Sequence, residues 1–347
     1  MASYEKFLQV GVALDPIHVG TGGARIGRVD LTIVRDPVTQ VPKIPGSSLA
    51  GVYRTYVAMA EHEGNPNRQV NNQAWPYYPH CAGLGQVRDN YLGHCGRYDC
   101  PVCTVFGFAR GKDQAGGFAG LAAFTDAHVL LFPVPTRRGP MWVTCPMALR
   151  VIGLEVQGVE ETAVYLENHS ANQLNLGWLL LPVQVCSDMG TIKKKLQNLS
   201  IPDYIQKRLA LVPDRLFAHI VNSNLEVRTS VSINPETGAA EERALFSYEA
   251  LPRGTVLVWE IIAKNPAHFN IGGQQITAVS DPAGVHKVVA KAHPYLGYLG
   301  IGGMGTRGMG RLEVLYSNQF PASQSAQCTL TASDQPSAST SQGGGQP

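Results

Sequence analysis

Residues 64–104 hold most of the side chains in this sequence that could bind a metal. Cys100 and Cys103 form a C-x-x-C pair, a spacing that lets two thiolates hold one tetrahedral zinc ion. Further possible ligands lie upstream, with the histidines as alternatives to the cysteines: Cys81, Cys95, His80 and His94. Because this stretch is polar, a structural zinc ion would stabilise it. The alternatives are reduced structural cysteines or a redox pair.

A glycine-rich run before the last predicted strand could bind phosphate. Seven of its residues are glycine: Gly297, Gly300, Gly302, Gly303, Gly305, Gly308 and Gly310. A backbone without side chains can approach a phosphate closely and point several N–H groups at it, and Arg307 could add a bidentate contact. No GKS or GKT sequence follows, so this is not a Walker loop. The alternative is a flexible turn.

The sequence IPGSSLAGVYR (residues 44–54) predicts the start of a helix. Either Ser47 or Ser48 can cap it, and the free N–H groups and positive dipole at this end suit a phosphate. Arg54 lies about two turns further along. The alternative is an ordinary capped helix with no ligand.

Asp30 and His18 flank a second glycine-rich loop, DPIHVGTGGARIG (residues 15–27). A carboxylate at Asp30 could hold a divalent cation, or position the 2′-hydroxyl of RNA as a nucleophile. The alternative is an ordinary turn residue, and we interpret Asp36 in VRDPVTQ as the cap of such a turn. Taken alone, His18 is expected to be structural.

The elements that must position these residues mix strands and helices. A long hairpin is expected near 224–249, where VRTSVSI and ALFSYEA are β-rich and NPETGAAEE forms the turn. Further strands are expected over residues 7–14, 29–35, 122–131 and 255–263, a second helix over 282–292, and a last strand after the glycine-rich run. This order predicts an α+β sheet fold with large insertions.

Length, charge and cysteine count narrow the class of protein. The 347 residues suffice for one large domain with insertions or for two small domains. With 16% charged residues and a net charge of +2, nucleic acid could be bound only through local groups. Seven cysteines, four of them clustered, favour a metal site in a cytoplasmic chain over disulfides. No secretory signal or membrane span is expected, and residues 319–347 have the composition of a disordered tail.

The order of these motifs resembles that of the RAMP superfamily of CRISPR-associated proteins. The resemblance rests on four segments: Gly27 to Asp30, Ile44 to Arg54, Cys100 to Gly107 and Gly302 to Gly310. The stretches 126–146 and 212–233 are similar to the repeated backbone subunit of Cmr-type, type III complexes. The cysteine cluster is more typical of other type III backbone subunits, which leaves the subtype open.

This resemblance implies a modified RRM-like (ferredoxin-like) core, β-α-β-β-α-β, over residues 1–63 and 105–318. It implies a zinc-binding insertion at 64–104 and a β-hairpin thumb at 224–249, which intrudes into the guide–target duplex. Several copies would stack along a crRNA guide, beside other type III CRISPR subunits. Candidate contacts to RNA are Lys43, Ser47, Ser48, Arg54, Gly303, Gly305, Arg307 and Gly308.

The resemblance also implies that the chain cuts complementary target RNA at regular intervals. Asp30 matches the position of the family's catalytic aspartate, and His18 on the same loop could assist. Cleavage in the family needs a metal such as Mg²⁺ or Mn²⁺ and uses the 2′-hydroxyl, leaving a cyclic phosphate and a 5′-hydroxyl. The alternative is a guide-binding scaffold subunit that does not cut.

Overall fold

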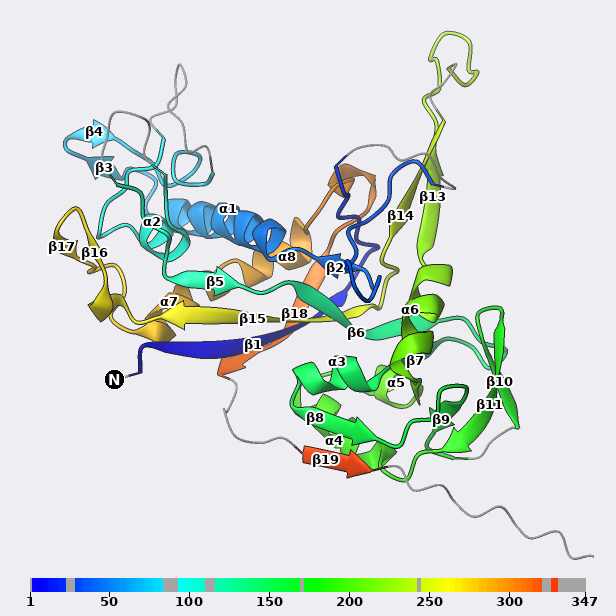
Figure 1. Cartoon of the computed structure of the whole chain (residues 1–347). Helices are drawn as coiled ribbons and strands as arrows, with labels where there is room; N and C mark the ends of the chain where they lie inside the picture. The colour runs from blue at the N-terminus through cyan, green and yellow to red at the C-terminus, as the bar shows by residue number, and fades with distance from the viewer. Residues whose placement is uncertain are drawn as a thin grey trace, which may run out of the picture.

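The structure is a computed structural model (Figure 1). It describes residues 2–22, 29–83, 93–109, 116–168, 172–241, 245–319 and 326–329. Gly27 and the rest of the loop at 23–28 lie outside these ranges.

Four long strands form the centre of the molecule. They are β1 (Tyr4–Ala13), β6 (Ala127–Val134), β15 (Val256–Lys264) and β18 (Leu312–Gln319). They lie in the order β18-β1-β15-β6, and each neighbouring pair is antiparallel. β1 is buried from Phe7 to Ala13, as expected of a central strand covered on both faces.

Helices cover one face of these strands (Figure 1). They are α1 (Gly46–Gly64), α2 (Pro101–Phe106), α7 (Pro282–Ala290) and α8 (His293–Tyr298). α1 buries Leu49, Tyr53 and Val57, which are four residues apart and so share one face of the helix. Along the chain the order is β1, α1, β6, β15, α7, β18, so each helix connects two strands of the central sheet.

The sheet continues beyond β6 into a second lobe, residues 141–223, at the lower right of Figure 1. Its strands are β7 (Met141–Thr144), β9 (Val164–Leu166), β10 (Gln173–Leu176), β11 (Leu179–Val185) and β12 (Leu209–Leu211). Its helices are α3 (Pro146–Val151), α4 (Met189–Asn198), α5 (Asp203–Gln206) and α6 (Asp214–Ser223). β7 and β12 pair in parallel, so the whole sheet is mixed.

Short elements complete the fold. They are β2 (Lys43–Ile44), β3 (Gln69–Val70), β4 (Gln73–Ala74), β5 (Ala122–Phe124), β8 (Leu154–Gln157), β16 (Asn270–Ile271), β17 (Gln274–Gln275), β19 (Ala326–Thr329) and the 3-10 turns η1 (Pro266–His268) and η2 (Gly305–Arg307). Among the described residues, no helix is long and apolar enough to cross a membrane.

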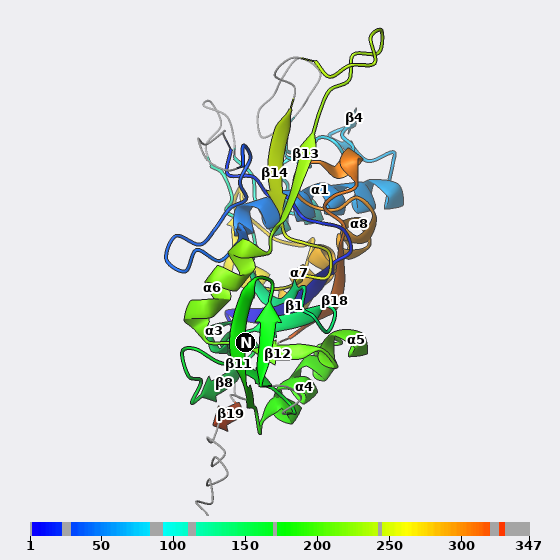
Figure 2. The ribbon, with the colours of Figure 1, turned by 90° about the vertical axis from the view of Figure 1, so that its right-hand side faces the viewer.

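The predicted hairpin is present. β13 (Glu226–Ser230) pairs antiparallel with β14 (Phe246–Ala250), with Glu226 opposite Ala250 and Ser230 opposite Phe246. The hairpin, which we call the thumb, stands away from the body, and α6 leads into it from below (Figures 1 and 2).

Two predicted elements are wrong. Residues 29–35 form no regular strand, because Leu31, Ile33 and Arg35 each bridge to a different segment of the chain. The tail is not wholly disordered, because β19 pairs in parallel with β8. Backbone pairing needs no apolar side chains, so a polar composition did not exclude it. Residues 320–325 and 330–347 of the predicted tail lie outside the described residues.

Candidate functional site

Asp30 lies against the base of the thumb. Its Oδ2 accepts two hydrogen bonds from Ser247 on β14, from the backbone N–H at 2.7 Å and from the hydroxyl at 2.8 Å. These bonds lower the pKa of Asp30, the backbone N–H most, because both favour the charged carboxylate. Asp30 is exposed, so the structure holds an ionised carboxylate where a ligand can reach it.

The segment that follows Asp30 is fixed to the same strand. Leu31 donates its N–H to the carbonyl of Ser247 at 3.1 Å and accepts from the N–H of Glu249 at 3.0 Å. The Glu249 side chain, which is 13% exposed, forms an ion pair with Arg35 at 2.9 Å and accepts from the N–H of Ile33 at 3.2 Å. Two alternate residues of β14, Ser247 and Glu249, therefore set the position of the Asp30 segment.

His18 lies beneath the same strand. It is buried, its Nδ1 lies 2.6 Å from the carbonyl oxygen of Glu249, and its ring meets the Tyr248 ring edge-on. Its own carbonyl accepts from the N–H of Gly303 at 2.8 Å. His18 thus joins the thumb, through Nδ1, to the glycine-rich run, through its backbone carbonyl.

The glycine-rich run serves two purposes. A Cβ on Gly302 would lie 2.3 Å from the His18 carbonyl oxygen, and a Cβ on Gly300 would lie 2.6 Å from the backbone of Gly310, so these positions need glycine for packing. Gly305 and Gly308 are different, because a Cβ on either would meet open space. The open glycines sit at the 3-10 turn η2, where a ligand backbone could approach.

The run also touches the thumb directly. The Arg307 guanidinium lies 5.5 Å from the centre of the Phe246 ring, in cation–π geometry. A small apolar cluster joins all three segments: Tyr248, Ala250 and Met309, with Leu31, Phe246 and Met304 packed against them. The structure thus brings together Asp30, His18 and the 303–308 stretch, which the sequence places almost 300 residues apart.

The start of α1 differs from the prediction. The helix begins at Gly46, and no side chain of Ser47 or Ser48 caps it. Asp126 takes that role from outside the helix, accepting the N–H of Gly46 at 2.8 Å. A Cβ on Gly46 would lie 2.4 Å from the Phe124 carbonyl oxygen, so the first residue of the helix must be glycine.

Lys43 and Asp36 have partners within the protein. Lys43 lies 2.6 Å from Asp126 and 3.7 Å from Asp36, and its bond to Asp126 raises its pKa. The Oδ1 of Asp36 accepts the N–H groups of Val38 and Thr39, as predicted for the cap of a turn. Lys43 is therefore part of an acidic network at the start of α1.

Arg54 points toward the cysteine insertion. Its Nε donates to the carbonyl of Cys81 at 2.8 Å, and its Nη2 lies 2.9 Å from Nδ1 of His94. His94 therefore receives a hydrogen bond from Arg54 at the nitrogen that faces it. His80 stands edge-on to Trp75, with 6.3 Å between ring centres.

Four cysteines form a compact group that could bind a metal such as zinc. The Sγ atoms of Cys81, Cys95, Cys100 and Cys103 all lie within 4.8 Å of one another. Cys95 lies 3.7 Å from Cys81 and 3.7 Å from Cys103. Zinc–sulfur bonds of about 2.3 Å in a tetrahedron place sulfurs about 3.8 Å apart, so the donor set fits zinc. The set is four cysteines, with neither histidine among the grouped ligands.

The surroundings of this cluster favour a thiolate at Cys95. Three neighbouring thiols donate to Cys95 and hold its pKa well below the usual range. Arg68 donates to Cys95 Sγ at 3.1 Å. Burial alone would lower the pKa of Arg68, but the charge of Cys95 and its hydrogen bond to Arg68 raise it. Cys100 is the N-cap of α2, and its side chain accepts the N–H of Cys103. The start of this helix therefore positions the C-x-x-C pair.

Comparison with known proteins gives this arrangement a context. The chain is 26% identical over 321 residues to the CRISPR system Cmr endoribonuclease Cmr4 of Pyrococcus furiosus, covering 87% of this chain and 92% of that one. It is 40% identical over 78 residues to the CRISPR system Cms endoribonuclease Csm3 of Enterococcus italicus, covering 21% of this chain and 36% of that one.

Solved structures share the fold. A chain of the type III-B Cmr-beta complex bound to cognate target RNA matches with a TM-score of 0.58 at 16% identity, covering 91% of this chain and 98% of that one. A crystal structure of Cmr4 matches with a TM-score of 0.56 at 19% identity, covering 91% and 100%. The RAMP superfamily profile matches residues 12–313. This chain therefore belongs to the RAMP superfamily.

Proposed function

We propose that this chain binds a crRNA guide as a repeated backbone subunit of a type III CRISPR complex and cuts the complementary target RNA. The observation that carries the proposal is the meeting of Asp30, thumb strand β14 and the open glycines of the 303–308 stretch. A relative that matches over 87% of the chain is named as an endoribonuclease. The strand order β18-β1-β15-β6, with α1 and α7 on its connections, supports an RRM-like core.

Asp30 is the proposed catalytic residue. Among the described residues, Ser247 donates to Oδ2, and we propose that Oδ1 binds a cation or the RNA. One carboxylate with RNA phosphates suits Mg²⁺ or Mn²⁺, since Mg²⁺ is usually held by one or two carboxylates plus substrate phosphates. When bound, the ion would stabilise the charge that develops on the phosphate.

In the proposed cleavage, the attacking group comes from the target RNA itself. The 2′-oxygen of the target loses its proton and bonds to the neighbouring phosphorus, while the bond from phosphorus to the 5′-oxygen breaks and that oxygen takes up a proton. The ionised Asp30 would orient the reacting ribose and phosphate at the thumb base. We assign His18 a positioning role, because its ring is buried between the thumb and Gly303.

Fewer residues are proposed to contact the guide than the sequence alone indicates. We propose that Gly305, Arg307 and Gly308 meet the guide backbone, with Ser47 and Ser48 close to it at the start of α1. The N–H of Gly303 is already bonded to His18. Lys43 and Arg54 are bonded to Asp126 and to the insertion, so structural roles suit them better. The four cysteines are proposed to hold a structural zinc.

The test uses the chain assembled on a guide RNA with its complementary RNA and Mg²⁺ or Mn²⁺. Asp30→Asn keeps an oxygen that can accept from Ser247 but removes the charge. We expect cutting at regular spacing by the unaltered chain and a loss of about a hundredfold or more in the variant, with target binding retained. Asp36→Asn is the matched control, because Asp36 caps a turn nearby. Undiminished cutting by Asp30→Asn would exclude Asp30, and binding without cutting by the unaltered chain would leave a scaffold subunit.

A further inference from the structure

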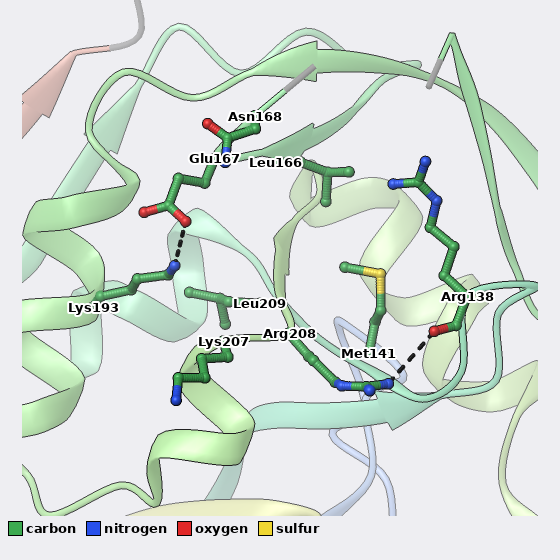
Figure 3. Close-up of a pocket in the computed structure, with 9 residues that line it drawn as sticks. All are labelled: Arg138, Met141, Leu166, Glu167, Asn168, Lys193, Lys207, Arg208 and Leu209. Carbon is green, nitrogen blue, oxygen red and sulfur yellow. Dashed lines mark hydrogen bonds and ion pairs between the residues drawn. The ribbon is translucent and has the colours of Figure 1, made fainter. Parts of the chain in front are cut away.

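The second lobe contains a hollow with a charged rim, shown in Figure 3. Its volume is about 250 Å³, close to the lower end of the range for sites that hold small molecules. The described residues that line it are not those proposed above to contact the guide or the target. They are Arg138, Met141, Leu166, Glu167, Asn168, Lys193, Lys207, Arg208 and Leu209. We call this site the basic hollow.

One wall of the basic hollow is apolar. Leu166 on β9 and Leu209 on β12 are 5% and 4% exposed, and Met141 on β7 is half-buried. These strands are neighbours in the sheet, in the order β9-β12-β7, so the three side chains lie side by side along the hollow. Protein pockets for a single base hold it between apolar or aromatic side chains. The wall therefore suits a flat ring of this kind.

Two polar side chains follow the end of β9, beside this wall. Glu167 accepts a hydrogen bond from Nζ of Lys193 at 2.6 Å, so its carboxylate is held at one side of the hollow in Figure 3. A carboxylate beside a nucleotide can accept hydrogen bonds from ribose hydroxyls. The amide of Asn168 offers both a donor and an acceptor to the edge of a base. Because Glu167 would repel a phosphate, this side suits the sugar and the base.

The opposite side of the basic hollow carries two arginines. Arg138 and Arg208 lie across from Glu167 in Figure 3. Nη1 of Arg208 lies 3.5 Å from the carbonyls of Arg138 and Pro140, and a Cβ on Gly139 would lie 2.7 Å from the same nitrogen, so the loop is shaped around this guanidinium. Arginine can bind two oxygens of one phosphate through parallel N–H bonds. With four cations and one carboxylate in its lining, the hollow attracts an anion at this side.

We propose that the basic hollow binds a ribonucleotide. Its base would lie against Leu166 and Leu209. Its ribose would donate to Glu167, and its phosphate would meet Arg138 and Arg208. The three kinds of lining match the three parts of this ligand, whereas a bare anion or an apolar molecule would use only one kind. Asp30 takes no part in this site, so the inference does not depend on the proposed function.

Two sources offer this chemistry, a free mononucleotide and one nucleotide of an RNA strand. The neighbouring surface distinguishes them. A second hollow of about 290 Å³ shares Arg138 and adds Arg137. The turn beside it is held by a bond of 2.9 Å from the N–H of Gly177 to the carbonyl of Pro135, and Trp178 on this turn is 79% exposed. A strand could stack a further base on Trp178, and a free mononucleotide has no second base to place there.

The test measures the binding of AMP to the full chain without RNA, by isothermal titration calorimetry. We expect one site, and adenosine and inorganic phosphate should each bind at least about tenfold more weakly, because each meets only part of the lining. Binding of dAMP should also be weaker than that of AMP, because dAMP lacks the 2′-hydroxyl. Arg138→Gln with Arg208→Gln should weaken AMP binding about tenfold or more and leave adenosine binding unchanged. The matched control is Lys194→Gln, an exposed cation on α4 outside the hollow.

A second variant tests the other side of the ligand. Asn168→Ala should weaken the binding of AMP and adenosine and leave that of inorganic phosphate unchanged, because Asn168 is assigned to the base. Should Arg208→Gln disturb the loop at Gly139, Arg138→Gln alone tests the phosphate contact, because Arg138 is exposed.

A competition experiment identifies the source of the nucleotide. A short single-stranded RNA that displaces AMP, and whose binding alone is weakened by Trp178→Ala, would identify a strand. An RNA that leaves AMP bound would identify a free nucleotide. The proposal is overturned if AMP gives no heat at millimolar concentration or if inorganic phosphate binds as tightly as AMP. It is also overturned if the arginine variants bind AMP as tightly as the unaltered chain does.

Discussion

The thumb base and the cysteine insertion lie toward opposite ends of the central sheet in Figure 1, and they hold their side chains in different ways. Cys100 and Cys103 come from one helix start and are fully buried. Asp30 is exposed and is held by Ser247, which lies 217 residues away in sequence. The buried site depends on local chain geometry, and the exposed site depends on how the thumb is seated.

This difference suggests that the two regions have different roles, one structural and one in binding a ligand. A buried, closed cluster with all four ligands from the protein has no open position for a substrate, which suits a structural metal. An exposed carboxylate with one oxygen engaged can accept a ligand that changes at each turnover. Variants of the two regions should therefore affect different measurements, stability for the cysteines and cutting for the thumb base.

The largest effect on stability is expected from the cysteine cluster. Cys103→Ser should abolish stoichiometric zinc binding and lower the free energy of unfolding by about 4 kcal/mol, because it removes a buried ligand of the cluster. Zinc content by mass spectrometry and urea unfolding measure both. Cys145→Ser is the control, since Cys145 is buried but outside the cluster. If Cys103→Ser loses stability and Cys145→Ser loses as much, without any difference in zinc, the cluster is ordinary core.

A smaller effect, specific to the rate of RNA cutting, is expected from Ser247→Ala. The change removes the hydroxyl bond to Asp30 and leaves the backbone N–H bond, so cutting should fall about tenfold with only a small loss in the free energy of unfolding. The pKa of Asp30 should rise, because a bond that favours its charged form is gone. The acid limb of the pH–rate profile would then move to higher pH. Ser230→Ala, on the other thumb strand, should change neither; equal losses in both variants would mean that the thumb is simply weakened.

Glu249→Gln tests the clamp behind Asp30. The substitution removes the charge that faces Arg35 while keeping a similar shape. We expect about 2 kcal/mol less stability, since hydrogen bonds to charged groups contribute about that much. Amide exchange over residues 31–35 should accelerate. Exchange that stays slow would show that the backbone bonds of Leu31 hold the segment without Glu249.

These two sites also explain what could be predicted from the sequence. The four cysteines, the hairpin at 224–249 and the turn cap at Asp36 all depend on residues close in sequence, and each is found as predicted. Ser247, Glu249 and Asp126 were missed, because their roles depend on partners 80 to 217 residues away. A serine in a strand or an aspartate in a loop carries no local signal of such a partner.

The failed predictions at residues 29–35 and at the start of α1 have a similar origin. Residues 29–35 alternate like a strand, but their partners are the thumb, Gly20 and Pro42 instead of one neighbouring strand. Alternation reports which side chains are buried, and it does not report which backbone supplies the hydrogen bonds. The predicted cap at Ser47 or Ser48 is wrong because Asp126, on the chain segment before β6, accepts the N–H of the first helical residue, Gly46.

Lowering the pH should reduce the stability of the folded chain while Asp30 keeps its charge. The loss of stability should be smallest at neutral pH. Burial lowers the pKa of His286 and of His293 to about 4, so both are neutral in the folded chain at pH 6. In the unfolded chain they take up protons near pH 6.5. Their contribution to stability is therefore complete above pH 6.5 and is lost as pH falls toward 4. Asp30 should keep its charge through this range, since its pKa lies below its ordinary value.

The measurement is the urea midpoint at steps between pH 7 and pH 4, beside the same series for His293→Phe. Because Nε2 of His293 is buried without a hydrogen bond in the described part of the chain, phenylalanine should be tolerated there. We expect near-equal midpoints for the two chains at pH 7 and a shallower fall for the variant below pH 6.5. Parallel curves would mean that protonation elsewhere, such as at the carboxylates near Lys43, governs acid unfolding. A shallower curve would place the acid sensitivity under the helices of the central sheet, away from the thumb base where Asp30 lies.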